Sequence, residues 1–191
     1  MADSVSANIL AVTYSGYGLS DGKPSIQGII DDGDAAYSYY SINFNNDLPV
    51  YVIGYSLGGF AVLNIATRHK VDGVVTISTF SSSYDLMQYL VKHKSPVLLR
   101  PFLKPVVDKK VFQLDNVALA KKLQVPVLFI HGEKDDFIPP FMCKKLFENC
   151  PNPSKQQAYI NGANHISIMY EAKYLCLVVH EINRFIFSKK P

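Results

Sequence analysis

Apolar side chains gather in five short runs along the chain, and each run has the length expected of a β-strand. The clearest runs are nearly continuous in apolar residues rather than alternating, which is typical of parallel strands that are buried on both faces. The five predicted strands are Asn8–Tyr14, Val50–Tyr55, Gly73–Ser78, Val125–His131 and Gln156–Asn161.

Between these runs, apolar residues recur every three or four positions, which indicates amphipathic helices. The predicted helices are Ser25–Ser41, Gly59–His69, Pro140–Asn149 and Tyr170–Ser188. Strand and helix therefore alternate along the chain, and this alternation predicts a parallel sheet between layers of helices. The expected class is α/β.

Residues 80–124 interrupt the alternation with a Ser-rich start, three prolines (Pro96, Pro101 and Pro105) and scattered apolar residues. We interpret them as a small helical, lid-like insertion over the carboxyl edge of the sheet. The length of 191 residues, with 48% of them hydrophobic, suits one domain that spans residues 1–191 and buries a substantial core.

No charged residue occurs from Leu48 to Thr67, a run close to the ~20 residues that span a bilayer. Its first half is β-branched and aromatic, and its second half is helical and begins with glycines, so a strand, a turn and a helix fit it better. The first residues of the chain do not resemble a signal peptide. Three cysteines (Cys143, Cys150 and Cys176) without zinc-site spacing indicate reduced thiols and a cytoplasmic location.

The pattern G-x-S-x-G occurs at Gly54–Gly58, where a predicted strand ends and a predicted helix begins. Such a turn holds its serine in a strained backbone conformation, with the hydroxyl exposed above the sheet. Small neighbours are needed because larger side chains would collide with the adjacent strand and helix. The pattern alone also fits an ordinary glycine-rich turn, so Ser56 is a candidate nucleophile that needs support from the rest of the chain.

Two further loops supply that support. His131–Pro139 follows an apolar strand and places Asp135 just beyond the strand's carboxyl end, where catalytic groups collect in open α/β sheets. Gly162–His165 follows the last predicted strand and brings His165 to the same edge. A nucleophile, a carboxylate and an imidazole are thus expected on three neighbouring loops.

These segments together resemble the α/β-hydrolase superfamily, especially its small esterases, lipid hydrolases and protein-depalmitoylating thioesterases. The order Ser56, Asp135, His165 is the order of nucleophile, acid and histidine in that superfamily. The resemblance covers the whole chain and implies a three-layer α/β/α sandwich with a mostly parallel sheet. It is carried by the loop Tyr14–Ser25, the nucleophile turn Gly54–Gly59, the acid segment Val125–Pro139 and the histidine loop Gly162–His165.

The chain departs from the superfamily at its start. In the superfamily, three strands precede the loop that Tyr14–Ser25 resembles. The third of these strands lies in the sheet between the superfamily's fourth and fifth strands. The segment Asn8–Tyr14 corresponds to the fourth, so the loop that gives one oxyanion-hole donor has no counterpart. We therefore expect an N-terminally truncated α/β-hydrolase fold with five parallel strands. The position of the superfamily's third strand, between Asn8–Tyr14 and Val50–Tyr55, is expected to be empty or to be closed by direct pairing of these two segments.

The resemblance implies a role for each site residue. Ser56 is the nucleophile, His165 is the base that takes its proton, and Asp135 is the acid that orients the imidazole. The backbone N–H of Leu57 donates to the oxyanion, and water then hydrolyses the acyl-enzyme. Asp136 is an alternative to Asp135, although the H-G-x-x-D spacing favours Asp135.

The function expected from this resemblance is hydrolysis of a carboxylic ester or thioester, of a lipid or an acylated protein. A non-catalytic or fragmentary hydrolase-fold binding module is the alternative, and a serine peptidase is a weaker one. The sequence contains no P-loop lysine, no G-x-G-x-x-G and no cluster of metal ligands, so no cofactor and no metal are expected. His131 resembles a strand-end histidine of the superfamily and is interpreted as structural.

The formal net charge of +3 is too small to indicate nucleic-acid binding. Residues 92–122, however, contain eight Lys or Arg against two Asp, a local excess of +6. A solvated surface explains this excess, and attraction to an anionic membrane or headgroup is the sharper alternative. Apolar residues of the same segment could hold an acyl chain or pack the insertion down: Leu98, Leu99, Phe102 and Leu103. A membrane-peripheral location is the corresponding alternative to a purely cytoplasmic one.

Overall fold

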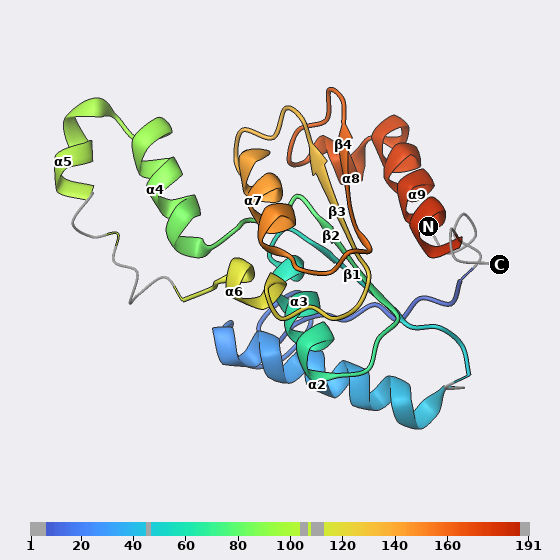
Figure 1. Ribbon diagram of the computed structural model, residues 1–191. Helices are drawn as coiled ribbons and strands as arrows, with labels where there is room; N and C mark the ends of the chain where they lie inside the picture. Colours follow the sequence, from blue (N-terminus) through green and yellow to red (C-terminus); the bar gives the residue numbers. More distant parts are fainter. Residues whose placement is uncertain (1–6, 45–46, 104–106, 108–112, 188–191) are drawn as a thin grey trace.

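Four parallel strands form the sheet of this protein, in the order β1-β2-β3-β4. Their bounds are β1 (Tyr51–Tyr55), β2 (Gly73–Ile77), β3 (Val127–Gly132) and β4 (Lys155–Ile160). The computed structural model describes residues 7–44, 47–103, 107 and 113–187, and Figure 1 shows the open sheet with helices on both sides. The predicted α/β class with a parallel sheet is confirmed.

The two central strands, β2 and β3, are buried along their whole length, as their continuous apolar runs predict. Their side chains alternate between two cores. Ile77 and Ile130 belong to the core under α8 (Ser167–Tyr170) and α9 (Ala172–Phe187). Val74 and Phe129 belong to the opposite core, under α3 (Gly58–Arg68), α6 (Asn116–Ala120) and α7 (Phe141–Asn149). Both faces of the sheet are therefore covered, which fixes the three layers.

The predicted helices form with small shifts at their ends. The first is α2 (Ile26–Asn43), which begins where the Ser25 hydroxyl accepts a hydrogen bond from the Gly28 N–H. The last predicted helix, Tyr170–Ser188, corresponds to α9, which begins at Ala172 because Glu171 is extended; Tyr170 is the last residue of α8. Ser188 lies outside the described residues. The uncharged run at Leu48–Thr67 contains β1, a turn and most of α3, which agrees with the predicted strand, turn and helix. Among the helices described, none has the length and apolar character needed to cross a bilayer.

Residues 80–124 contain α4 (Ser83–His93), a 3-10 turn η1 (Val97–Leu99), α5 (Arg100–Leu103) and α6. Figure 1 shows α4 and α5 standing off to one side of the sheet, whereas α6 lies beneath α7. The buried residues Asn116 and Ala120 anchor α6 to the main body. Four residues that the sequence singled out in this segment lie outside the described residues: Lys104, Pro105, Lys109 and Lys110.

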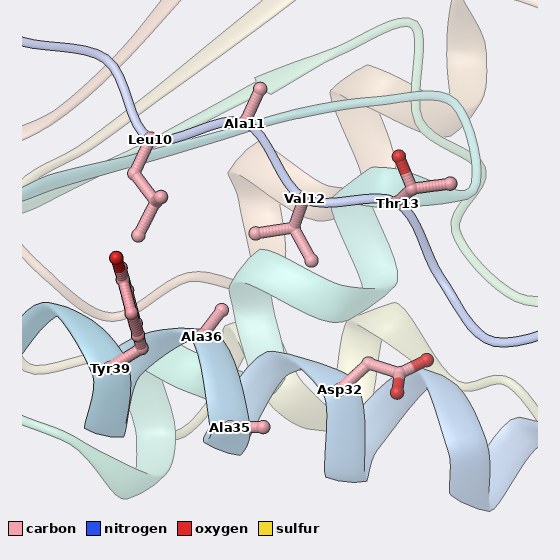
Figure 2. A pocket seen from close by; sticks show the side chains of 8 residues that line it. All are labelled: Leu10, Ala11, Val12, Thr13, Asp32, Ala35, Ala36 and Tyr39. Atoms are coloured by element: carbon pink, nitrogen blue, oxygen red, sulfur yellow. The ribbon is translucent and has the colours of Figure 1, made fainter. Parts of the chain in front are cut away.

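The predicted first strand, Asn8–Tyr14, is wrong, and the described sheet has four strands rather than five. A strand needs a neighbour for its backbone ladder, and residues 8–14 pair with no strand of the described sheet. Residues 10–13 line a hollow together with α2. Ser15 fixes this course, because its N–H and hydroxyl donate to the Asp32 carboxylate of α2 at 2.7 and 2.8 Å. Figure 2 shows Leu10–Thr13 passing over α2, with a hollow of about 350 Å³ between them.

The hollow between α2 and residues 10–13 does not contain the predicted catalytic groups, because Ser56, Asp135 and His165 are not among its lining residues. Within the described residues, the edge of β1 away from β2 has no strand paired to it. Of the two expected arrangements, direct pairing of Asn8–Tyr14 with β1 is absent from the described sheet, and the edge of β1 is left unpaired.

Candidate active site

The nucleophile candidate Ser56 lies in the turn between β1 and α3, with a φ of 54°. This left-handed conformation is strained for a residue with a Cβ. The turn is fixed on both sides: the Ser56 N–H donates to the Ile77 carbonyl at 2.8 Å, and the Thr79 hydroxyl donates to the Ser56 carbonyl at 3.2 Å. The strain is thus held by the neighbouring strand β2 and the residues that follow it.

Two of the three glycines around Ser56 are required by close packing. A Cβ at Gly54 would overlap the backbone of Gly58, and a Cβ at Gly59 would overlap the Thr79 side chain. Gly58 differs, since a Cβ there would meet only the Tyr14 hydroxyl, at an ordinary 3.8 Å. The expectation that small residues are needed on both sides of the serine therefore holds at Gly54 and Gly59 and not at Gly58.

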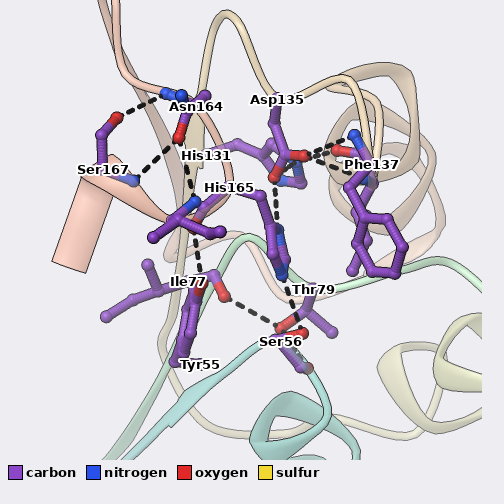
Figure 3. Close-up of polar contacts among 12 residues, drawn as sticks. Tyr55, Ser56, Ile77, Thr79, His131, Asp135, Phe137, Asn164, His165 and Ser167 are labelled. Carbon is purple, nitrogen blue, oxygen red and sulfur yellow. Dashed lines mark hydrogen bonds and ion pairs between the residues drawn. The ribbon is translucent and has the colours of Figure 1, made fainter. Parts of the chain in front are cut away.

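Asp135 and His165 lie at the carboxyl ends of β3 and β4, and the structure brings both to Ser56 (Figure 3). His165 Nδ1 is 2.7 Å from Asp135 Oδ2, and His165 Nε2 is 3.1 Å from Ser56 Oγ. Three residues predicted from separate loops therefore form one hydrogen-bonded chain. The alternative acid, Asp136, points elsewhere and pairs with Lys94 of the insertion at 2.5 Å.

The Asp135 carboxylate is buried and almost fully occupied by donors. Its Oδ1 accepts the N–H groups of Phe137 and Ile138 at 3.1 and 2.8 Å, which leaves Oδ2 for His165. Burial raises the pKa of Asp135, but hydrogen bonds from His131, His165 and Ile138 outweigh burial and lower it to about 2. Asp135 is therefore an ionised acceptor that holds the proton of His165 on Nδ1 and leaves Nε2 free to accept.

His131 supports Asp135 from within the core, in keeping with its interpretation as structural. Its side chain is fully buried, and Nε2 lies 2.8 Å from the Ile138 carbonyl and 3.5 Å from Asp135 Oδ2. The shorter distance identifies the Ile138 carbonyl as the main hydrogen-bond acceptor. His131 therefore ties the end of the acid loop to its start, and within the described part of the chain its Nδ1 has no partner.

The histidine loop is tied both to the acid loop and to α8. A Cβ at Gly132 would lie 2.5 Å from the Ala163 carbonyl, so only glycine allows the two loops to approach this closely. Asn164 Oδ1 accepts the N–H groups of Ile166 and Ser167, and Ser167 Oγ accepts the Asn164 N–H in return. This reciprocal pairing encloses His165. Residues of the type Asn-x-x-Ser at a helix start are the sequence signal that could have predicted it.

Two aromatic residues that the sequence analysis did not assign flank the imidazole. The Tyr55 ring stacks on it with centroids 5.2 Å apart, and the Phe137 ring lies at the same distance with a larger tilt. The Tyr55 hydroxyl also donates to the His165 carbonyl. Tyr55 and His165 are 110 residues apart in the chain, so no local pattern could have linked them.

Leu57 follows Ser56 directly and is the N-cap of α3, with helical φ and ψ of −58° and −34°. Its role as an oxyanion donor stays a prediction. Among the described residues, no group of three or more His, Cys, Asp or Glu side chains is arranged to hold a metal ion. The groups that the structure brings together at the site are the Ser56 hydroxyl, the His165 imidazole, the Asp135 carboxylate and the start of α3.

A family described as serine hydrolase (FSH1) matches residues 20–166 of the chain. An uncharacterized membrane protein of Saccharomyces cerevisiae, YNL320W, is 32% identical over 152 residues, which cover 78% of this chain and 51% of that protein. The α/β hydrolase domain-containing protein WAV2 of Arabidopsis thaliana is 31% identical over 175 residues, which cover 84% of this chain and 54% of that protein. The chain thus spans about half the length of these curated relatives.

Among solved structures, an esterase of Pyrococcus furiosus resembles the chain with a TM-score of 0.69 over 91% of this chain and 66% of that one. The two sequences are 18% identical, so this likeness shows the shared fold alone. The fold of an esterase and the match to a family of serine hydrolases agree with the three-residue chain of hydrogen bonds at the sheet edge.

Proposed function

The chain belongs to the serine hydrolase (FSH1) family, and we propose that it cleaves a carboxylic ester or thioester through an acyl-enzyme on Ser56. The observation that carries this proposal is the continuous contact from Ser56 Oγ through His165 to Asp135, at 3.1 and 2.7 Å. An ionised, buried Asp135 beside Nδ1 leaves Nε2 as the basic atom, facing the hydroxyl it must deprotonate.

The proposed reaction has two halves. Ser56 Oγ attacks the carbonyl carbon while its proton moves to His165 Nε2, and the imidazolium then gives that proton to the leaving alcohol or thiol. In the second half, His165 takes a proton from water, the hydroxide attacks the acyl carbon, and the proton returns to Ser56 as the acid departs. Asp135 stabilises the imidazolium in both halves and does not itself become protonated.

The negative oxygen that forms in each half needs hydrogen-bond donors. The N–H of Leu57 is the proposed donor, because it immediately follows the nucleophile at the start of α3. The N-terminal end of a helix carries a partial positive charge, so α3 stabilises the oxyanion through its dipole as well. One donor removed from such a site typically costs ~10²–10³ in turnover, which is the size of the contribution proposed for the Leu57 N–H.

Exposed apolar side chains beside the imidazole favour an acyl substrate over a peptide. Phe137 lies against His165, Ile166 follows it directly, and Tyr170 lies at the end of α8; all three are exposed. An acyl chain that extends from Ser56 would cover this apolar surface and would be stabilised by the removal of that surface from water.

A non-catalytic binding module is the second candidate, favoured by the described sheet of four strands with one open edge.

The test is to trap the acyl-enzyme. The purified chain is mixed with p-nitrophenyl butyrate or with an acyl-thioester and quenched in acid, and the mass of the intact protein is measured. We expect one added acyl group on the Ser56 peptide and none in Ser56→Ala, with both proteins equally folded. A fluorophosphonate gives the same comparison without turnover. Labelling of Ser56→Ala at another residue, or no labelling of the folded wild type by either reagent, would rule out Ser56 as the nucleophile.

A further inference from the structure

The arm formed by α4, η1 and α5 ends in an apolar surface that the rest of the described protein does not cover. Four side chains make up this apolar tip: Val97, Leu98, Leu99 and Phe102, with exposed fractions of 69%, 86%, 50% and 76%. Four large apolar residues this exposed within six consecutive positions differ from the single exposed apolar residues that are normal on protein surfaces.

The apolar tip is carried away from the sheet. In Figure 1, α4 and α5 stand apart from the sheet and its covering helices, and α5 lies at the far end of the arm. Pro96 and Pro101 lie at the starts of η1 and α5, and Arg100 Nε donates to the Ser95 carbonyl at 3.2 Å. The turn that presents the apolar side chains is therefore held by local contacts.

The charges that the arm itself contributes beside the apolar tip have one sign. From Leu86 to Leu103 the chain contains no Asp or Glu, whereas it contains Lys92, Lys94 and Arg100. Lys92 is exposed, and Lys94 pairs with Asp136 across from the arm. An apolar centre flanked by Lys92 and Arg100 is complementary to a bilayer that contains anionic lipids. The apolar side chains can enter the acyl boundary while the cations contact the headgroups.

We propose that the apolar tip inserts into the headgroup and acyl boundary of an anionic bilayer, with Lys92 and Arg100 against the lipid headgroups. Insertion at this boundary reaches about 5–10 Å and needs no spanning helix. The Lys94–Asp136 pair joins the end of α4 to the loop that carries Asp135, so bound protein would hold its site close to the bilayer surface. Membrane binding by the apolar tip does not depend on the proposed hydrolysis.

The chain contains no tryptophan, so a single substitution supplies a specific probe. Leu98→Trp places the probe on the apolar tip, and Ile42→Trp places a matched probe on another exposed apolar residue, near the end of α2. Vesicles of phosphatidylcholine with phosphatidylserine should shift the emission of Leu98→Trp to shorter wavelength and leave Ile42→Trp unchanged. Lipids brominated near the headgroup should quench the first probe alone.

The charge requirement is tested by sedimentation of the otherwise wild-type chain with the same vesicles. Lys92→Gln combined with Arg100→Gln should weaken binding about tenfold, as should added salt. Lys121→Gln combined with Lys122→Gln removes the same charge from exposed positions after α6 and should leave binding unchanged. Leu98→Ser combined with Phe102→Ser should also weaken binding about tenfold, because less apolar surface is buried in the bilayer.

Several outcomes would overturn the proposal. The first is an emission of Leu98→Trp that vesicles do not shift, and the second is equal binding to vesicles with and without phosphatidylserine. The third is an equal loss of vesicle binding in the Lys92/Arg100 and the Lys121/Lys122 double variants. A tip that serves another protein would give the first of these results. The substituted side chains on the arm are partly or fully exposed, so the thermal midpoints of the variants should stay close to that of the wild type. Arg100→Gln also removes the hydrogen bond to the Ser95 carbonyl and should lower the midpoint slightly. The probe experiment stands even if one double variant fails to fold.

Discussion

The ring of Tyr55 stacks on the imidazole of His165 with 29° between their planes, while its hydroxyl donates to the His165 carbonyl at 2.5 Å. Burial, reinforced by the charge of Asp135, raises the pKa of Tyr55 to about 12, so the hydroxyl keeps its proton at ordinary pH. The residue before the proposed nucleophile therefore holds the proposed base through two separate contacts.

Tyr55→Phe separates these two contacts, because it keeps the ring and removes the hydroxyl. We expect kcat to fall about tenfold with little change in KM, and stability to fall by about 1 kcal/mol for one lost hydrogen bond. Tyr55→Leu, which removes both contacts, should lower kcat further. Steady-state kinetics on a p-nitrophenyl ester and denaturant unfolding provide the two measurements. Equal kcat in wild type and Tyr55→Phe would show that the hydroxyl does not position His165.

The adjacent carboxylates Asp135 and Asp136 provide a matched pair of substitutions. Asp135→Asn should lower kcat by about 10⁴, because an amide donates to the imidazole and stabilises the wrong tautomer. Asp136→Asn breaks only an exposed pair with Lys94 and should change kcat less than threefold, in line with the small free energies of surface ion pairs. A comparable loss in both variants would contradict the assignment of Asp135 as the acid.

The low pKa of Asp135 predicts a stability contribution that is present above pH 4 and disappears as the pH falls toward 2. The folded protein holds this carboxylate ionised down to about pH 2, whereas the unfolded chain protonates it near the ordinary value of 3.8, so acid favours the unfolded chain. Between pH 5 and pH 2.5, the free energy of unfolding should fall by roughly 1–2 kcal/mol more in wild type than in Asp135→Asn. Urea unfolding at both pH values measures this difference, and parallel losses would contradict the prediction.

The two glycines after the proposed nucleophile should respond differently to a methyl group. Gly59→Ala drives a Cβ into Thr79, whose hydroxyl also supports the Ser56 carbonyl, and should cost about 1–3 kcal/mol of stability as well as activity. Gly58→Ala meets no atom closer than 3.8 Å and lies at the start of α3, so it should be neutral or slightly stabilising. Thermal unfolding of the two variants checks this, and similar midpoints would contradict the packing argument.

The residues that the sequence could supply are those whose patterns are local. The turn around Ser56, the acid after β3 and the histidine after β4 each follow a buried strand, and parallel strands bring their carboxyl ends to one edge. The segment Asn8–Tyr14 failed because a strand depends on a partner for its backbone, which composition does not reveal. Tyr55 was missed because its contact with His165 exists only after the sheet and the histidine loop have formed.

The side-chain oxygen of Asn164 accepts hydrogen bonds from the two backbone N–H groups that follow His165. Asn164→Ala leaves both groups without this acceptor, so it should lower stability by about 1 kcal/mol and let the imidazole move from its contacts with Ser56 and Asp135. We therefore expect a fall in kcat of about tenfold, since small misplacements of catalytic groups are costly. Asn164→Asp keeps the accepting oxygen and should retain most of the activity.

Asn152 offers the matched control for Asn164, because its Oδ1 accepts the Ser154 N–H in a similar turn before β4. Asn152→Ala removes this hydrogen bond, far from Ser56 in the sequence and on the amino side of the strand, so it should lower stability slightly and leave kcat unchanged. Activity is measured under conditions where every variant is fully folded, which separates positioning from stability. If Asn164→Ala loses stability but keeps wild-type kcat, the enclosure of His165 by Asn164 and Ser167 supports the fold alone.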